Sequence, residues 1–87
     1  MAQHLGLDGF PRSKEEDERI SQNIQALFRT PNGKEVLKYL RSITIEAVSG
    51  GGVTDAELRH LEGQRFLVGL IERRFKHGEK VNGRSSR

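Results

Sequence analysis

Apolar side chains recur at helical spacing in three segments of the chain. In the first segment they are separated by four, three and one residues, as Ile20, Ile24, Leu27 and Phe28. This spacing forms a single apolar stripe, and the opposite face is polar. Ser13 and Glu16 match a capping box, in which the serine oxygen and the glutamate each satisfy a free backbone N–H. The pattern predicts a helix from Ser13 to about Arg29.

The second segment begins with Thr30 and Pro31, which suit the N-cap and the first position of a helix. Its apolar stripe consists of Val36, Leu37, Leu40 and Ile43, with Tyr39 at the edge. The connection from the first helix is so short that the two helices are expected to be close neighbours. Asn32 and Gly33 predict local turn geometry, because the spaced glycines, lysine and Ser/Thr of a phosphate-binding P-loop are missing.

Four residues, Ser49–Gly52, interrupt the helical pattern and predict a flexible joint. Thr54 and Glu57 then form a second capping box, which begins a third helix expected to end near Gly78. This helix has apolar residues on two sides. The broad side carries Leu58, Leu61, Val68, Ile71 and Phe75, and the other side carries Phe66 and Leu70 beside Gly63. We expect one side to pack internally and the other to meet a partner chain or an extended arm.

Gly63 and Arg65 lie within this third helix. A glycine inside a helix costs about 1 kcal/mol relative to alanine, so its presence favours the close approach of another backbone. Arg65 would then fix that contact through a carboxylate or a carbonyl. The alternative is a surface ion pair between Glu62 and Arg65, worth about 0.2–0.5 kcal/mol.

The two ends of the chain differ from the helical segments. Residues 1–12 contain two glycines, a proline and few apolar groups, and predict an extended arm with Phe10, Leu5 and Leu7 as anchors. Residues 78–87 contain two glycines, two serines and scattered basic groups, and predict a basic tail. The expected organisation is therefore all-α, with an arm at 1–12, a three-helix domain at 13–77 and a tail at 78–87.

The composition of the chain limits the classes of function that we expect. A domain of 87 residues with about one third hydrophobic residues is expected to be marginally stable alone. There is no cysteine and there are three scattered histidines, so neither disulfides nor a metal site are expected, and oligomerisation or docking remains as the stabilising device. No nucleophile–base spacing indicates an enzyme, and no cofactor is expected. No apolar run approaches the roughly 20 residues that cross a bilayer, and the N-terminus lacks the features of a secretory signal.

Charge is unevenly distributed along the chain. The last 15 residues carry six basic and one acidic side chain, a net charge of +5, whereas the first 72 residues carry a net charge of −2. The basic tail is either a solvated end or a contact for an acidic protein surface or for packaged nucleic acid.

Two short motifs point to a family. Phe28 is followed by Thr30, Gly33, Val36, Leu37 and Leu40, and a variable stretch separates these from Glu62, Gly63, Arg65, Leu67, Val68 and Ile71. Over about residues 20–75 this resembles a family of small structural proteins of tailed bacteriophages, named after a virion protein of a Bordetella podophage. The resemblance implies a non-enzymatic virion component, made in the host cytoplasm.

Together these observations predict a structural subunit that docks in multiple symmetric copies on a larger portal, capsid or tail adaptor protein, at the portal or head–tail vertex. The competing hypothesis is a small nucleic-acid-binding or regulatory protein that uses its basic tail. The residues expected to contact a partner are Phe10, Gly63, Arg65, Phe66, Leu70, Arg73 and Arg74.

Overall fold

The computed structural model describes residues 4–47 and 54–85. Within these ranges the chain forms three helices, α1 (Lys14–Phe28), α2 (Pro31–Ser42) and α3 (Asp55–Ser85), and its extended backbone is limited to one isolated bridge between Leu5 and Pro11. The predicted all-α fold of three helices is confirmed. The expected joint at residues 49–52 lies outside the described residues.

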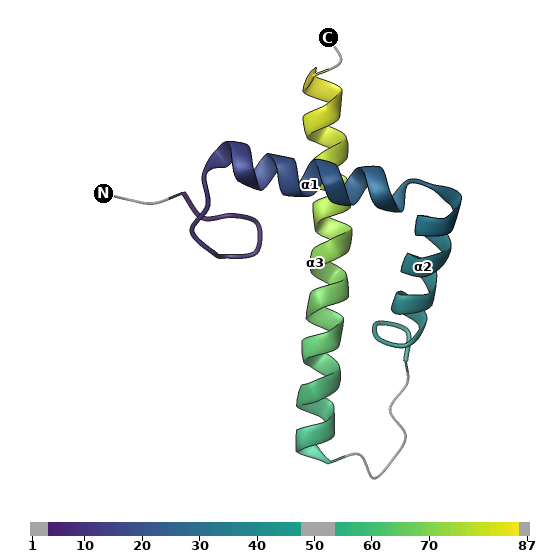
Figure 1. Ribbon diagram of the computed structural model, residues 1–87. Coiled ribbons are helices and arrows are strands. Elements are labelled where there is room, and N and C mark those ends of the chain that lie inside the picture. The colour runs from purple at the N-terminus through teal and green to yellow at the C-terminus, as the bar shows by residue number, and fades with distance from the viewer. Residues whose placement is uncertain (1–3, 48–53, 86–87) are drawn as a thin grey trace.

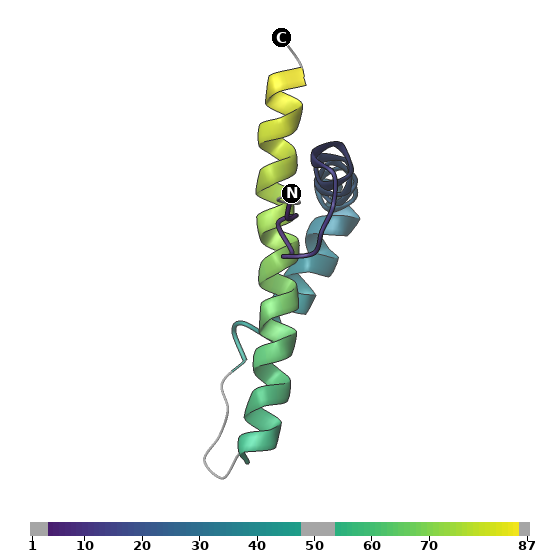
Figure 2. The same cartoon turned by 90° about the vertical axis from the view of Figure 1, so that its left-hand side faces the viewer.

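The long helix α3 is the axis of the molecule, and α1 crosses its C-terminal half while α2 descends beside it (Figure 1). Both shorter helices lie on the same side of α3 (Figure 2). The molecule is consequently flat, with principal extents of 52 × 40 × 13 Å. A flat molecule of this kind leaves each helix with a face that no other helix covers.

Capping explains where α1 and α3 begin. The Ser13 hydroxyl accepts a hydrogen bond from the Glu16 backbone N–H at 3.1 Å, but the Glu16 carboxylate accepts from the Arg12 guanidinium at 3.2 Å. At α3, the Thr54 hydroxyl accepts from the Glu57 N–H at 3.1 Å, and the Glu57 carboxylate accepts from the Thr54 N–H at 3.2 Å. The predicted reciprocal box is thus confirmed at Thr54, and the serine half of it at Ser13.

Two glycines allow the helices to approach one another closely. A Cβ atom on Gly78 would lie 2.6 Å from the Gln25 Cβ and would also collide with the Ser21 carbonyl, so only glycine fits where α1 crosses α3. A Cβ atom on Gly33 would lie 2.6 Å from the Phe28 Cα. The interpretation of Gly33 as local turn geometry alone is therefore too narrow, because this buried residue lets the start of α2 pack against the end of α1.

The expected end of α3 near Gly78 is wrong, because the helix continues to Ser85. Val81 is only 6% exposed. The Asn82 side chain donates to the Gln25 side chain at 3.0 Å and accepts from Gln22 at 3.3 Å. Packing against α1 stabilises the last turns of α3, so most of the predicted basic tail is helix.

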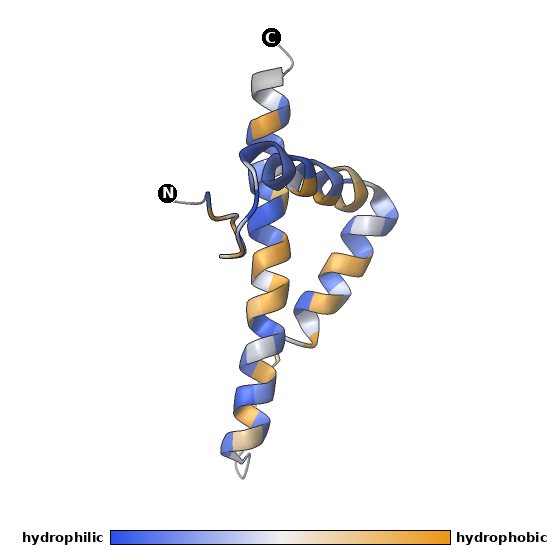
Figure 3. Ribbon diagram, turned by 60° about the vertical axis from the view of Figure 1, so that its left-hand side comes forward, coloured by the Kyte–Doolittle hydropathy of each residue, from blue (hydrophilic) through white to orange (hydrophobic). Residues whose placement is uncertain are grey.

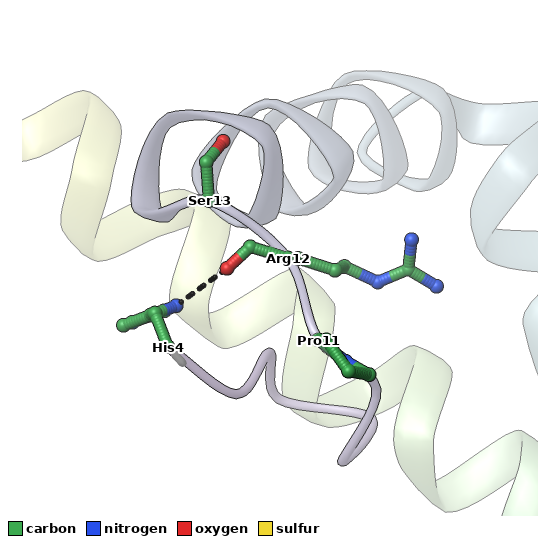
Figure 4. Close-up of a pocket in the computed structure, with 4 residues that line it drawn as sticks. All are labelled: His4, Pro11, Arg12 and Ser13. Atoms are coloured by element: carbon green, nitrogen blue, oxygen red, sulfur yellow. Dashed lines mark hydrogen bonds between the residues drawn. The ribbon is translucent and has the colours of Figure 1, made fainter. Parts of the chain in front are cut away.

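The N-terminal segment is folded back on itself, and the expected extended arm is corrected accordingly. The Gly6 N–H donates to the Phe10 carbonyl at 2.8 Å, and the Arg12 N–H donates to the His4 carbonyl at 3.1 Å. Figure 4 shows the closed base of this loop, where His4 Nδ1 lies 3.1 Å from the Arg12 carbonyl oxygen and the Arg12 side chain points away from His4. We call residues 4–12 the N-terminal loop.

The apolar core is small. Among the described residues, Val68 and Val81 are the buried hydrophobic side chains, whereas the buried polar residues are Asp17, Ser21, Thr44 and Arg74. Hydrophobic residues gather in the middle of α3, and on α2 hydrophobic residues alternate with hydrophilic ones (Figure 3). Polar contacts therefore contribute much of the interaction that joins α1 to α3.

Candidate partner-docking surfaces

Arg74 lies in the interior, at the crossing of α1 and α3. Its Nη1 donates to the Asp17 carboxylate at 2.5 Å, to the Asp17 carbonyl at 3.0 Å and to the Ser21 hydroxyl at 3.0 Å, and its Nη2 lies 3.4 Å from the Asp8 carboxylate. With 2% of the residue exposed, Arg74 is not a partner contact, and that prediction is corrected. Its position on α3 shows why: it faces α1, which the amino-acid pattern alone does not reveal.

The carboxylates around Arg74 are stabilised in their charged form. The hydrogen bond from the Arg12 guanidinium is the main reason why the pKa of Asp8 falls to about 2. Burial by itself would raise the pKa of Asp17, but the Leu7 N–H, which donates to its carboxylate at 3.0 Å, and the Arg74 charge lower it below its ordinary value. Asp17 thereby ties the N-terminal loop and α3 to the start of α1.

Ser21 and His77 complete this cluster. The Ser21 hydroxyl lies 2.7 Å from His77 Nδ1, and Ser21 is fully buried. No substrate reaches a serine oxygen in this position, so the pair serves to join α1 to α3.

Arg65 is used inside the chain as well. Its Nε donates to the Thr44 carbonyl at 2.9 Å, and its Nη2 donates to the Ala47 carbonyl at 2.7 Å. The sequence predicts that Arg65 fixes a contact through a carboxylate or a carbonyl, and the structure places two carbonyls of the segment after α2 at hydrogen-bond distance from it. Arg65 therefore anchors residues 44–47 to α3, and its contact with a partner stays a prediction.

Four of the remaining predicted residues share one face of α3, which we call the α3 stripe: Gly63, Phe66, Leu70 and Arg73. Phe66 is 61% exposed and Leu70 is half-buried. A Cβ atom on Gly63 would have no neighbouring atom within 4 Å. The Arg73 guanidinium lies 5.7 Å from the centroid of the Phe66 ring, a cation–π contact. The stripe is open to solvent in this chain, so no internal element covers the second apolar side of α3.

A second exposed apolar face lies on α2. Val36, Tyr39 and Ile43 are 51%, 61% and 47% exposed, and we call them the α2 stripe. The sequence pattern placed Val36 and Ile43 on the same face as Leu37 and Leu40, but only Leu37 and Leu40 are half-buried. The spacing of three and four residues from Val36 to Tyr39 to Ile43 is itself helical, and this signal could have separated the two faces.

A shallow groove of about 360 Å³ runs between the end of α1, α2 and α3, and its lining residues are Phe28, Lys34, Leu37, Lys38, Arg41, Glu72 and Phe75. The Arg41 Nη1 donates to both oxygens of the Glu72 carboxylate, at 2.7 and 2.9 Å, and so ties α2 to α3. Lys34 and Lys38 are exposed at the rim. The amino-acid sequence does not reveal this groove, because three helices form it and it belongs to no single motif. We call it the basic-rimmed groove.

The N-terminal loop presents the predicted contact Phe10 at the surface. Phe10 is 62% exposed and Leu5 is 61% exposed, and the Arg12 guanidinium lies 5.7 Å from the centroid of the Phe10 ring. Arg12 also pairs with the carboxylates of Asp8 at 2.8 Å and Glu16 at 3.2 Å. Phe10 is thus displayed on an ordered loop beside the start of α1.

Across residues 4–47 and 54–85, no group of three or more His, Cys, Asp or Glu side chains is arranged to hold a metal ion. The same residues contain no helix that is long and apolar enough to span a membrane.

A family of phage proteins is similar to this chain over most of its length. The family model of the Bbp19-like phage protein matches residues 24–82, which begin within α1 and extend almost to the end of α3. No curated protein and no solved structure matches the chain. Because the match covers well over half of the 87 residues, the chain belongs to the family of Bbp19-like phage proteins.

Proposed function

We propose that this phage protein is a non-enzymatic structural component of the tailed-phage virion, which docks in multiple copies on a larger head, portal or head–tail protein. The proposal rests on the small number of buried hydrophobic side chains compared with the number of large exposed ones. Two hydrophobic side chains are buried among the described residues, whereas ten large ones are exposed to 38% or more. Large exposed apolar areas mark interaction sites in stable proteins.

The α3 stripe is the best candidate for the contact with the larger protein. It is straight and it is supported by a helix that α1 fixes through Gly78 and Arg74. Because Gly63 has no Cβ atom, a partner's backbone can approach α3 closely at this position of the stripe. Phe66 supplies a large aromatic surface of the kind that dominates binding energy in protein interfaces, and Arg73 can pair with a carboxylate at its edge.

The test is incorporation of a Gly63→Leu variant into phage particles. Because the space around Gly63 is open, leucine does not disturb the fold, but it blocks close approach to the stripe. We expect normal helix content by circular dichroism and loss of the variant from purified particles. The matched control is Ala26→Leu, which places the same leucine side chain at an exposed position of α1, and which should be incorporated normally. Wild-type incorporation of Gly63→Leu would contradict docking through the α3 stripe.

The alternative function, nucleic-acid binding, is favoured by one specific observation. The helix continues through the segment that the sequence assigned to a tail, so Arg73, Lys76 and Lys80 are exposed at helical spacing on a rigid rod. A row of basic side chains can neutralise successive phosphates along a nucleic-acid backbone.

A charge change separates the two functions better than a deletion, because removing residues 78–87 would also remove the buried Val81. In a Lys76→Glu/Lys80→Glu variant, nucleic-acid binding predicts strongly reduced DNA affinity and a flatter dependence on salt. Structural docking predicts that the variant still enters particles. If the variant loses DNA binding and particle incorporation together, the tail-based alternative is the better account.

A further inference from the structure

Two edges of the molecule are complementary in charge and in apolar character. The N-terminal loop and the start of α1 (residues 4–18) carry five acidic and two basic side chains. The buried Arg74, which pairs with Asp8 and Asp17, compensates one of these charges, so this edge keeps a net charge of −2. The two residues before α2 and α2 itself up to Arg41 (residues 29–41) carry four basic and one acidic side chain, a net charge of +3. Opposite charges on facing surfaces steer association and fix its orientation.

The first edge offers an apolar anchor that is already ordered. Phe10 is 62% exposed, its backbone N–H donates to the Asp8 carboxylate at 3.1 Å, and Arg12 stacks on its ring. Glu15 is exposed in the first turn of α1. A rigid aromatic side chain loses little conformational entropy on binding, which makes Phe10 suited to insertion into a pocket.

The second edge offers a matching hollow. The basic-rimmed groove has Phe28, Leu37 and Phe75 at its floor and Lys34 and Lys38 at its rim. Its volume of about 360 Å³ leaves space for an aromatic side chain. An apolar floor with a rim of ammonium groups favours an apolar side chain that lies near carboxylates. On the first edge the Arg12 guanidinium lies over the Phe10 ring, and Arg12 is itself paired with the carboxylates of Asp8 and Glu16.

These two edges lie on opposite flanks of α3, the loop on one side and α2 on the other (Figure 1). One chain cannot bring them together, but two chains can. We propose that copies of this protein associate head to tail, with Phe10 of one copy inserted into the basic-rimmed groove of the next. Such a contact is heterologous, and it repeats until a ring closes or a filament forms. This proposal does not depend on docking to a larger virion protein.

The test uses the purified full-length chain and two variants in sedimentation velocity experiments over a range of concentrations. The loop variant is Phe10→Ser, and the groove variant is Lys34→Glu/Lys38→Glu. We expect wild-type chains to associate beyond the dimer as concentration rises. Losing burial of one Phe side chain should weaken association about 10- to 100-fold, and each variant alone should stay monomeric where the wild type associates.

Mixing the two variants gives the sharpest result. The Phe10→Ser chain keeps an intact groove and the groove variant keeps an intact Phe10, so the mixture contains one functional contact. We expect one-to-one heterodimers that do not grow further. The matched control is Phe66→Ser, which removes an equally exposed phenylalanine (61%) from the α3 stripe and should leave association unchanged.

Three outcomes would overturn the proposal. The first is a wild-type chain that stays monomeric at all concentrations. The second is association that is lost in Phe66→Ser and kept in Phe10→Ser, which would place the contact between copies on the α3 stripe. The third is a mixture of the two variants that assembles beyond dimers. None of these results changes the expected effect of Gly63→Leu on particle incorporation, so the two proposals are tested separately.

Discussion

At the scale of single residues, Arg74 and the two carboxylates beside it hold the helix crossing together. The Arg74 side chain is 3% exposed and that of Asp17 is 9% exposed, so their charges are balanced largely by each other. Removing one partner of a buried ion pair typically costs about 3–5 kcal/mol, because the other charge is left unpaired. We therefore expect Arg74→Ala to lower the free energy of unfolding by about that amount in urea titrations.

The neighbouring residue provides the control for Arg74. Arg73 has the same chemistry but is exposed, and exposed substitutions usually change stability by less than about 0.5 kcal/mol. Arg73→Ala should therefore unfold at nearly the wild-type urea concentration. Equal destabilisation by the two substitutions would show that burial of Arg74 does not contribute to stability.

Acid should destabilise the fold through the same carboxylates. The pKa of Asp8 is lowered to about 2 and the pKa of Asp17 is lowered as well, whereas in the unfolded chain both titrate near about 3.9. Their contribution to stability is therefore complete above pH 4 and is lost as the pH falls from 4 towards 2. Thermal unfolding at constant ionic strength should give a Tm that falls over this range. The Asp17→Asn variant should start from a lower Tm and show a shallower fall.

At the scale of helices, the amino-acid sequence was sufficient where the signal is local. Ser13, Thr30 and Thr54 each cap the helix that the sequence assigned to them, because a cap is formed by residues three apart. The end of α3 could not be predicted, since its last turns are stabilised by burial of Val81 and by hydrogen bonds of Asn82 to residues of α1 about 60 positions away. No local pattern contains that information.

Among the predicted partner-contact residues, too, some positions follow from local sequence and others depend on contacts with distant parts of the chain. The exposure of Phe66 follows from its position opposite the broad apolar side of α3, and periodicity is enough to find it. Arg65 and Arg74 lie next to exposed residues in sequence but face the segment after α2 and α1, respectively. Periodicity identifies the faces of a helix, but it does not tell which face another element will cover.

The helix crossing itself leads to a prediction about two glycines of α3. A methyl group on Gly78 would collide with the Ser21 carbonyl and with Gln25, so Gly78→Ala should force α1 and α3 apart and destabilise the fold by about 1–3 kcal/mol. Gly63→Ala meets open space and should instead stabilise the helix by about 0.5–1 kcal/mol. Urea titrations of both variants measure whether each substitution lowers or raises the free energy of unfolding. Stabilisation by Gly78→Ala would show that α1 and α3 do not cross closely at this point.

At the scale of the whole molecule, stability and assembly are expected to be coupled. The flat shape and the two hydrophobic side chains that are buried among the described residues leave a single copy with little apolar burial, and we expect association to add to this burial. A partner that binds only the folded state raises stability as its concentration rises above the dissociation constant. The apparent Tm of the wild-type chain should therefore depend on its own concentration.

The expected dependence of Tm on chain concentration follows from the stability that association adds. Raising the concentration of free chain from the dissociation constant to about a hundredfold above it adds about 2 kcal/mol of stability, which corresponds to about 8–16 °C in Tm for a domain of this size. Scanning calorimetry of the wild-type chain over that range measures the shift, and Phe10→Ser should show a Tm that is nearly independent of concentration. A wild-type Tm that does not change, together with a single sharp unfolding transition, would mean that the isolated chain is stable by itself and that polar contacts such as those of Arg74 supply what the small apolar core does not.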